Sequence, residues 1–270
     1  MAIEVPGQLD VYQATLRLLA SGSAGIFTDL DGTLAPLRSN PKDVSISSKV
    51  RNALSELNRR LPVVVLTGRC SREAREIVGL DSLIYAGNHG LEIIRPGDLR
   101  ASYTNETRSY MGSVNRVFVL ANLQFESSDI AVENKMLSVS LHYRNAMNAQ
   151  TAREAINDFI RIHCEPNGLQ AHYGKMVVDL RPPTGDKGTA LLALASDLLL
   201  DRAIVLGDDA TDVSSFRAVS RFQTDGDQNG LRIAVATSGT PRDLIAIADH
   251  VLSDTQDVET LLDWLATKIA

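Results

Sequence analysis

Carboxylates gather directly behind apolar runs at two points of the chain. The segment "AGIFTDLDGT" places Asp29 and Asp31 after the first run, and "AIVLGDD" ends on Asp208 and Asp209, with Asp212 one helical turn later. Carboxylates resist burial, so acids at the ends of buried strands call for a ligand. Oxygen groups of this kind suit a hard metal ion. The ends of two predicted strands are therefore candidates for a binding site.

Two further polar groups stand at comparable places. Thr67, Gly68 and Arg69 follow the apolar run "PVVVL", and Lys187 opens a later helical segment. In open parallel sheets, ligands bind beyond the carboxyl ends of the strands, so we expect all four groups to converge on one pocket. Each group alone also has a structural interpretation, because Asp-Gly is a common turn and Gly-Asp-Asp can cap a helix.

Three familiar binding motifs do not fit these residues. A calcium loop that begins at Asp29 would need glycine at its sixth position and glutamate at its twelfth, but Gly32 is fourth and Asn40 is twelfth. No G-x-G-x-x-G follows a predicted strand, and no Walker phosphate loop is present. The sequence thus favours neither an EF-hand nor a mononucleotide or dinucleotide site.

The elements that must position these groups alternate between strand and helix. Short apolar runs bounded by glycine predict buried strands, and apolar residues at helical spacing predict helices between them. Ser47 or Ser48 is the expected cap of the first of these helices and Ser71 of the next, and Trp264 in the last helix is expected to pack on the core. The predicted strands span residues 24–30, 62–68, 83–87, 203–209 and 232–236, and the helices 47–61, 71–80, 187–199, 212–219 and 258–269.

The pattern changes between these two blocks. After "RPGD" at 95–98 come a helix around 114–120, a partly alternating strand segment at 129–144, a helix at 151–164 and a hairpin around Gly174-Lys175. Helices with adjacent alternating strands predict an α+β insertion on an antiparallel sheet. We therefore expect an α/β fold: a Rossmann-like parallel-sheet catalytic core at 1–96 and 181–270, split by an inserted α+β cap at 97–180.

Composition restricts the partners. The net charge of -6 and the lack of a basic run argue against nucleic acid. Glu4 and Asp10 precede any basic residue, which is atypical of a signal peptide, and the most apolar stretch is too short to span a bilayer. Cys70 and Cys164 follow no metal-ligand spacing and are expected to be reduced thiols of a cytoplasmic protein, with one disulfide as the alternative. We expect a monomer that binds no membrane.

The four polar groups, in this order, resemble the motifs of the haloacid dehalogenase superfamily of phosphotransferases. The resemblance covers all four motifs and most of the core. It implies that Asp29 is a nucleophile and metal ligand, and that Asp31 binds metal through its backbone carbonyl while its side chain serves as general acid and base. It further implies that Thr67 hydrogen-bonds the phosphate and that Lys187 holds the phosphate and Asp29.

Mg²⁺ is the cofactor that this resemblance implies. A carboxylate that attacks a phosphate dianion needs the charge between them neutralised, which Mg²⁺ does with few carboxylates and substrate oxygen. Asp208 would be the second metal carboxylate, and Asp209 and Asp212 would support the metal or its waters. The last motif departs from the usual pattern, because Val213 and Ser214 follow Asp212.

A narrower resemblance concerns the substrate. "YAGNHGLE" at 85–92, "VENKMLSVSLHYR" at 132–144 and "GKMVVDLRPP" at 174–183 are similar to trehalose-6-phosphate phosphatases, a likeness that extends over about residues 24–265. It implies that Glu133 and Lys135 bind sugar hydroxyls. Other positions that it implies as substrate contacts are Arg69, Asn88, His89, Arg144 and Lys175.

Alternatives stay open at this point. Glu133 and Lys135 are also explained as a surface pair on one strand face, His142 as a packed or capping histidine, and Arg69 as a residue that orients the active-site loop. The substrate is alternatively another glycosyl phosphate, such as a mannosyl- or glucosyl-phosphoglycerate or a pseudo-disaccharide phosphate. A non-catalytic sugar-phosphate binder would be expected to lose Asp29, Asp31 or Lys187, and all are present. We therefore predict an Mg²⁺-dependent phosphatase of trehalose 6-phosphate.

Overall fold

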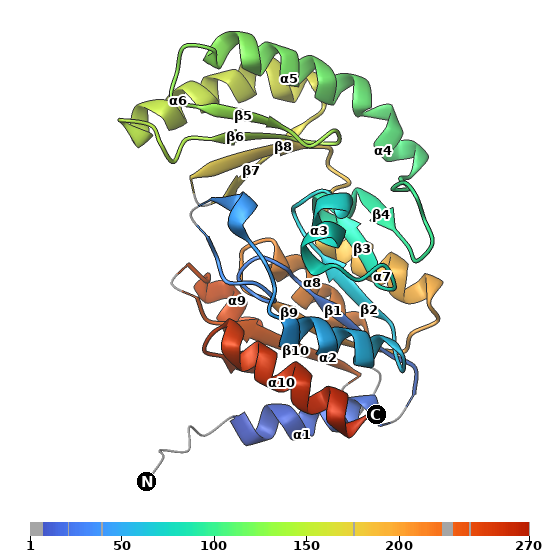
Figure 1. Cartoon of the computed structure of the whole chain (residues 1–270). Coiled ribbons are helices and arrows are strands. Elements are labelled where there is room, and N and C mark those ends of the chain that lie inside the picture. The colour runs from blue at the N-terminus through green and yellow to red at the C-terminus, as the bar shows by residue number, and fades with distance from the viewer. Residues whose placement is uncertain are drawn as a thin grey trace. The chain divides into compact units, whose positions relative to one another are not determined.

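A computed structural model describes residues 8–20, 22–38, 40–174, 176–222, 229–237 and 239–269 (Figure 1). The chain forms two compact units, one of Met1–Ser102 with Asp186–Ala270 and one of Tyr103–Gly185. These boundaries fall a few residues from those expected at 96/97 and 180/181. The assignment of the units as catalytic core and cap stays a prediction.

The first unit is built on a seven-stranded sheet in the order β11-β10-β9-β1-β2-β3-β4. Neighbouring strands run parallel throughout, except that the edge strand β4 is antiparallel to β3. The mainly parallel α/β architecture predicted from the alternating pattern is confirmed. The strands are β1 (Ala24–Thr28), β2 (Val63–Leu66), β3 (Ile84–Gly87), β4 (Glu92–Ile94), β9 (Arg202–Gly207), β10 (Gly230–Val235) and β11 (His250–Leu252).

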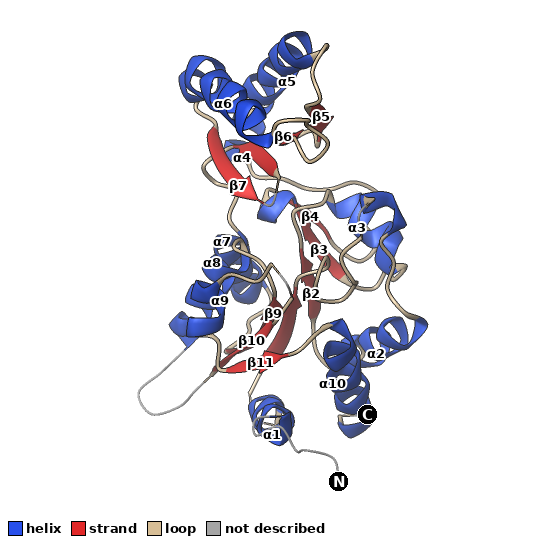
Figure 2. Cartoon of the chain, turned by 90° about the vertical axis from the view of Figure 1, so that its left-hand side faces the viewer, coloured by secondary structure: helices blue, strands red, loops and turns tan. Residues whose placement is uncertain are grey.

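Helices cover both faces of this sheet (Figure 2). One apolar layer joins the sheet to α1, α2, α3 and α10, and the other joins it to α7, α8 and α9. Because both faces are covered, the central strands carry almost uninterrupted apolar residues. The helices are α1 (Gln8–Leu19), α2 (Ser48–Asn58), α3 (Ser71–Val78), α7 (Lys187–Asp197), α8 (Asp212–Val219), α9 (Arg242–Ile247) and α10 (Thr255–Lys268).

Strand register brings the carboxyl ends of the central strands to one level. Thr28, the last residue of β1, pairs with Val65 in β2 on one side and with Leu206 in β9 on the other. The residues that follow β1, β2 and β9 must therefore leave the sheet at the same edge. This register positions the polar groups described below.

The second unit has a four-stranded antiparallel sheet in the order β5-β6-β8-β7. Apolar residues from one face of the sheet form a common core with α5 and α6. The predicted α+β organisation and the β7–β8 hairpin are therefore present. The elements are α4 (Asn105–Ser109), α5 (Met111–Phe125), β5 (Ala131–Asn134), β6 (Val139–His142), α6 (Ala149–Phe159), β7 (Gln170–Gly174) and β8 (Val177–Arg181).

The segment 129–144 is a hairpin rather than one strand, and here the sequence interpretation was wrong. Asn134 ends β5, and its side chain accepts a hydrogen bond from the N–H of Met136 at 2.7 Å. Met136 takes a left-handed conformation, and the N–H of Lys135 bonds Ser138 O at 3.0 Å. Asparagine forms such local turns readily, so the chain reverses where alternation alone suggested continuation. Lys135 thus lies in a turn and does not share a strand face with Glu133.

Four smaller predictions concern the helix caps, Trp264 and the cysteines. Ser47 caps α2, with its hydroxyl accepting the Val50 N–H at 3.0 Å, as expected. The cap predicted for α3 was wrong, because Ser71 is its first helical residue and Cys70 precedes it without a side-chain capping bond. Trp264 packs against the core of the first unit. Cys70 and Cys164 are both free thiols, as expected.

Among the described residues, no helix combines the length and apolar character needed to cross a membrane.

Candidate active site

Polar side chains from three adjacent strands meet at the carboxyl edge of the first unit's sheet. The N–H of Asp29, just beyond β1, bonds Leu206 O in β9 at 3.0 Å, and the N–H of Thr67, just beyond β2, bonds Ala86 O in β3 at 2.9 Å. Asp29, Thr67 and Asp208 are all buried. The structure therefore brings the strand-end groups together, as their position in the sequence suggested.

Lys187 joins this edge from the first turn of α7. Its Nζ lies 2.6 Å from Asp29 Oδ1 and 2.8 Å from Asp212 Oδ1, and its side chain is only 2% exposed. Burial by itself would lower the pKa of Lys187, but the carboxylates of Asp212 and Asp29 hold that pKa well above its ordinary value. Lys187 is therefore a fixed positive charge beside Asp29.

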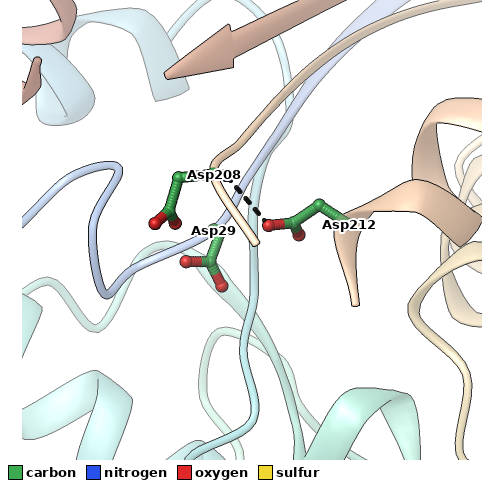
Figure 3. A group of neighbouring side chains, drawn as sticks. All are labelled: Asp29, Asp208 and Asp212. Atoms are coloured by element: carbon green, nitrogen blue, oxygen red, sulfur yellow. Dashed lines mark hydrogen bonds between the residues drawn. The ribbon is translucent and has the colours of Figure 1, made fainter. Parts of the chain in front are cut away.

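Three buried carboxylates point toward one another here (Figure 3). One oxygen from each of Asp29, Asp208 and Asp212 lies within 4.8 Å of the others. Burial raises the pKa of Asp29 well above its ordinary value although Lys187 opposes it. Burial, and then the charges of Asp212 and Asp209, raise the pKa of Asp208 to about 8. One ammonium does not neutralise three carboxylates, so the cluster favours a further cation.

The free oxygens of the cluster fit a hard divalent ion. Among the described residues, the hydrogen-bond donors to the Asp208 carboxylate are the hydroxyls of Thr33 and Thr237, each at 3.4 Å. Within the described chain, the second oxygen of Asp29 accepts no hydrogen bond. Mg²⁺ takes carboxylate oxygens and keeps several waters, so this all-oxygen set suits it. Asp29 and Asp208 are thus fitted to be direct ligands.

Asp212 is placed to support the site. Its Oδ1 accepts the Lys187 ammonium at 2.8 Å, and its Oδ2 accepts the backbone N–H groups of Asp208 and Asp209 at 3.0 and 3.1 Å (Figure 3). Both oxygens are therefore already in use. The carboxyl group of Asp209 is exposed and bonds Thr211, with its Oδ1 accepting the N–H at 2.8 Å and the hydroxyl at 2.6 Å. The predicted metal-supporting role of Asp209 would accordingly need mediating waters.

Asp31 is oriented by Arg69. Asp31 Oδ2 accepts Arg69 Nε at 2.7 Å, and Asp31 Oδ1 accepts Nη2 at 2.8 Å, which is a bidentate pair. Arg69 also contacts Glu73 and donates to Pro41 O at 3.0 Å. This geometry favours the interpretation that Arg69 orients the active-site loop over the one that it contacts the sugar.

Gly32 allows the turn after β1 to lie against the side chain of Asp208. Its φ of +90° is one that side-chain-bearing residues rarely adopt, and a Cβ there would lie 2.2 Å from Asp208 Oδ2. Only glycine fits both conditions. The Asp-Gly pair is therefore a turn, as the structural interpretation had it, and that turn leads directly into the carboxylate cluster.

Thr67 keeps a hydroxyl proton available. Its Oγ1 accepts the N–H of Arg69 at 3.1 Å, and no acceptor for its own proton occurs among the described residues. Asn88 and His89 follow β3 and are both buried beside this loop. The Asn88 side chain donates to Glu92 Oε1 at 3.1 Å, so its amide serves a contact within the protein.

The predicted sugar contacts of the second unit have partners within that unit. His142 Nε2 lies 2.7 Å from Glu133 Oε2, and this hydrogen bond lowers the pKa of Glu133. Lys135 Nζ lies 3.3 Å from Asp179 Oδ1. Arg144 is exposed just beyond β6, and Lys175 falls outside the described residues. Glu133 and Lys135 therefore belong to two separate polar contacts and are not an ion pair with each other.

Sequence reasoning missed two residues beside the carboxylate cluster and one beside the loop of Thr67 and Arg69. Thr237 follows β10 as Thr67 follows β2, so its position at a strand end was a usable signal. Thr33 lay inside the first quoted motif, but its role as a neighbour of Asp208 was not assigned. Glu92 ended the quoted segment "YAGNHGLE", but its role was not assigned, because a single acid there does not reveal what it contacts.

The fold defines a class of protein. It matches a haloacid dehalogenase-like hydrolase from Bacteroides thetaiotaomicron with a TM-score of 0.64 at 16% identity, covering 92% of this chain and 100% of that one. It also matches the C-terminal domain of Candida albicans trehalose-6-phosphate phosphatase with a TM-score of 0.78 at 19% identity, covering 95% and 96%. The chain thus has the haloacid dehalogenase fold, and its buried aspartates lie at the carboxyl edge of the sheet.

Sequence comparison gives the family. The profile of the trehalose-phosphatase family matches residues 27–244, and the chain belongs to that family of sugar-phosphate phosphatases. Trehalose 6-phosphate phosphatase RA3 of Zea mays is 27% identical over 97% of this chain and 75% of its own length. An uncharacterized glycosyl hydrolase of Mycobacterium tuberculosis is 32% identical over 80% of this chain, and the match spans only 17% of that relative.

Proposed function

We propose that this protein is an Mg²⁺-dependent phosphatase that hydrolyses trehalose 6-phosphate through an aspartyl-phosphate at Asp29. The observation that carries the proposal is the environment of Asp29. One of its oxygens bonds the buried ammonium of Lys187, the other accepts no hydrogen bond from any described residue, and Asp208 is adjacent. Membership of the trehalose-phosphatase family supports the substrate.

The chemistry runs in two balanced steps. In the first, the free oxygen of Asp29 attacks phosphorus, the bond from phosphorus to the sugar oxygen breaks, and Asp31 gives its proton to that leaving oxygen. In the second, water attacks phosphorus while Asp31 takes its proton, and the bond between phosphorus and Asp29 breaks. Free sugar and inorganic phosphate leave, and both aspartates return to their initial state.

The surrounding residues reduce charge repulsion and fix geometry. Mg²⁺ held by Asp29, Asp208 and the backbone carbonyl of Asp31 would neutralise the charge of the phosphate. Lys187 supplies a second positive charge, which Asp212 keeps in place. The free hydroxyl proton of Thr67 is suited to donate to a phosphate oxygen.

Asp31 must lose one of its hydrogen bonds to Arg69 before it can act as an acid. In the structure both of its oxygens accept hydrogen bonds from Arg69. The second step, in which Asp31 accepts a proton, needs the carboxylate form of Asp31. For the first step one carboxyl oxygen must carry a proton, so one of the two Arg69 bonds must break before the leaving group departs.

A phosphate-release screen tests the proposal directly. The chain is incubated with Mg²⁺ and a panel containing trehalose 6-phosphate, other hexose and disaccharide phosphates, and glycosyl phosphoglycerates. We expect the highest kcat/KM for trehalose 6-phosphate. A clear preference for another glycosyl phosphate would retain the chemistry and replace the substrate. Binding without release of phosphate from any compound would favour the non-catalytic binder and refute the enzyme.

Variants of the second unit test the source of sugar specificity. A carboxylate accepts and an ammonium donates hydrogen bonds, so Glu133 and Lys135 are suited to sugar hydroxyls. One charge-assisted hydrogen bond contributes ~1.5–3 kcal/mol, so Glu133→Ala or Lys135→Ala should lower kcat/KM for the sugar phosphate by ~10–150-fold. Turnover of p-nitrophenyl phosphate, which offers no sugar hydroxyls, should change little.

The matched control is Glu126→Ala. Glu126 is an exposed carboxylate in the same unit, at the end of α5, and should leave both reactions unchanged. Equal losses on the sugar phosphate and on p-nitrophenyl phosphate would show that Glu133 and Lys135 support the fold, and would contradict their assignment to the sugar.

The cytoplasmic location and the monomeric state stay predictions.

A further inference from the structure

A buried carboxylate that has no part in the proposed mechanism lies next to the loop that carries Thr67 and Arg69. Glu92, the first residue of β4, is 8% exposed. It forms no ion pair with any residue in the described ranges. A buried carboxylate without a cation costs several kcal/mol unless hydrogen bonds compensate. The contacts of Glu92 should therefore reveal what it does.

Glu92 joins two segments of the chain through one oxygen. Its Oε1 accepts the backbone N–H of Ser71 at 2.7 Å and the side-chain amide of Asn88 at 3.1 Å. The N–H of Ser71 is the first of α3, and Cys70 before it supplies no side-chain cap. The positive end of a helix favours a carboxylate. Glu92, which lies in β4, therefore takes the place of the missing side-chain cap of α3.

The helix that Glu92 caps begins directly after the loop that carries Thr67 and Arg69. Two backbone bonds tie the same loop to the turn after β3: the N–H of Asn88 bonds Arg69 O at 2.7 Å, and the N–H of His89 bonds Thr67 O at 2.9 Å. The loop is thus held at its beginning, its middle and its end by the segment 88–92.

The turn after β3 needs such support. Asn88 and His89 have φ values of +51° and +56°, a conformation that costs residues with side chains about 1–2 kcal/mol each. The approach is also close, because a Cβ at Gly87 would lie 2.2 Å from the N of Ser71. The bond from the Asn88 amide to Glu92 fixes this unfavourable turn against the start of α3.

We propose that Glu92 is a positioning residue of the active site, which fixes the loop of Thr67 and Arg69 by tying the start of α3 to Asn88. The proposal rests on the proposed function, in which Thr67 bonds the phosphate and Arg69 orients Asp31. It also gives Asn88 and His89 a different role from the one expected: they act on the phosphate through this loop instead of contacting the sugar.

The test compares Glu92→Ala and Glu92→Gln in the full chain with Mg²⁺. Alanine removes both hydrogen bonds, and a small displacement of catalytic groups costs ~10²-fold, so kcat should fall by that order. The loss should be equal for trehalose 6-phosphate and p-nitrophenyl phosphate, because both use the same loop. Inhibition by inorganic phosphate should weaken in parallel. Glutamine keeps an acceptor for both donors and should restore most of the rate.

Two controls separate positioning from folding. Glu76→Ala removes an exposed carboxylate from the same helix and should leave kcat unchanged. Asn88→Ala removes only one of the two hydrogen bonds to Glu92, so its kcat should fall less than that of Glu92→Ala. This variant provides the test if Glu92→Ala does not fold. Thermal unfolding of each variant gives the folded fraction at the assay temperature.

The outcomes are distinct. A kcat of Glu92→Ala equal to that of the wild type would overturn the inference. So would a loss that only matches the folded fraction, or a loss on the sugar phosphate alone. If the wild type itself released phosphate from no substrate, the proposed function would fail first, whatever the variants did.

Discussion

Replacing Asp29 by asparagine is expected to lower kcat by at least ~10⁴-fold, the scale of loss when a covalent nucleophile is removed. The amide has nearly the same shape but is barely nucleophilic. The fold should persist, because Lys187 keeps its bond to Asp212 at 2.8 Å. Steady-state phosphate release measures the loss, and thermal unfolding checks the fold.

The covalent step has its own readout. Acid-quenched wild type incubated with the preferred sugar phosphate should carry one added phosphoryl group, located at Asp29 by peptide mass spectrometry, and Asp29→Asn should carry none. Asp243→Asn, which changes an exposed aspartate of α9 in the same unit, is the matched control and should behave as wild type. Near-normal turnover by Asp29→Asn would end the covalent proposal.

Removal of divalent metal is expected to abolish activity, and Mg²⁺ to restore it. The reason is the excess of acidic groups at the site: the Lys187 ammonium pairs with Asp29 and Asp212, and Asp208 adds a third carboxyl group beside them. Ca²⁺ should inhibit instead of replacing Mg²⁺, because its larger and more flexible coordination shell misplaces the attacking oxygen. Activity is measured after EDTA treatment and after addition of each ion.

Stability provides a measurement that does not depend on turnover. An ion that binds only the folded chain stabilises it by ~2.7 kcal/mol at a concentration one hundred times its Kd, so Mg²⁺ should raise Tm. Asp208→Asn should weaken this increase, whereas Asp243→Asn should not. Full activity after exhaustive chelation, or a Tm that does not respond to Mg²⁺ in any variant, would contradict a metal at these carboxylates.

The sequence by itself determined the architecture and the neighbourhood of the site. Continuous apolar runs such as that of β2 are typical of strands covered on both faces, and their alternation with helical segments indicated a doubly covered α/β sheet. Parallel strands end at one edge, so residues as distant as Asp29 and Asp208 had to meet once their strands were recognised. This part was predictable because strand and helix periodicity is local and the convergence of strand ends is a general property.

Only the tertiary structure decided which side chain contacts which. Arg69 and Asp31 are separated by 38 positions, and Glu92 and Ser71 by 21. Their contacts depend on loop conformations such as the left-handed turn at Asn88, which periodicity does not encode. For the same reason the hairpin at Met136 was missed: a local asparagine bond reversed the chain inside an otherwise strand-like segment. Loop geometry is set by a few specific hydrogen bonds, and these exist only once the sheet has brought distant segments together.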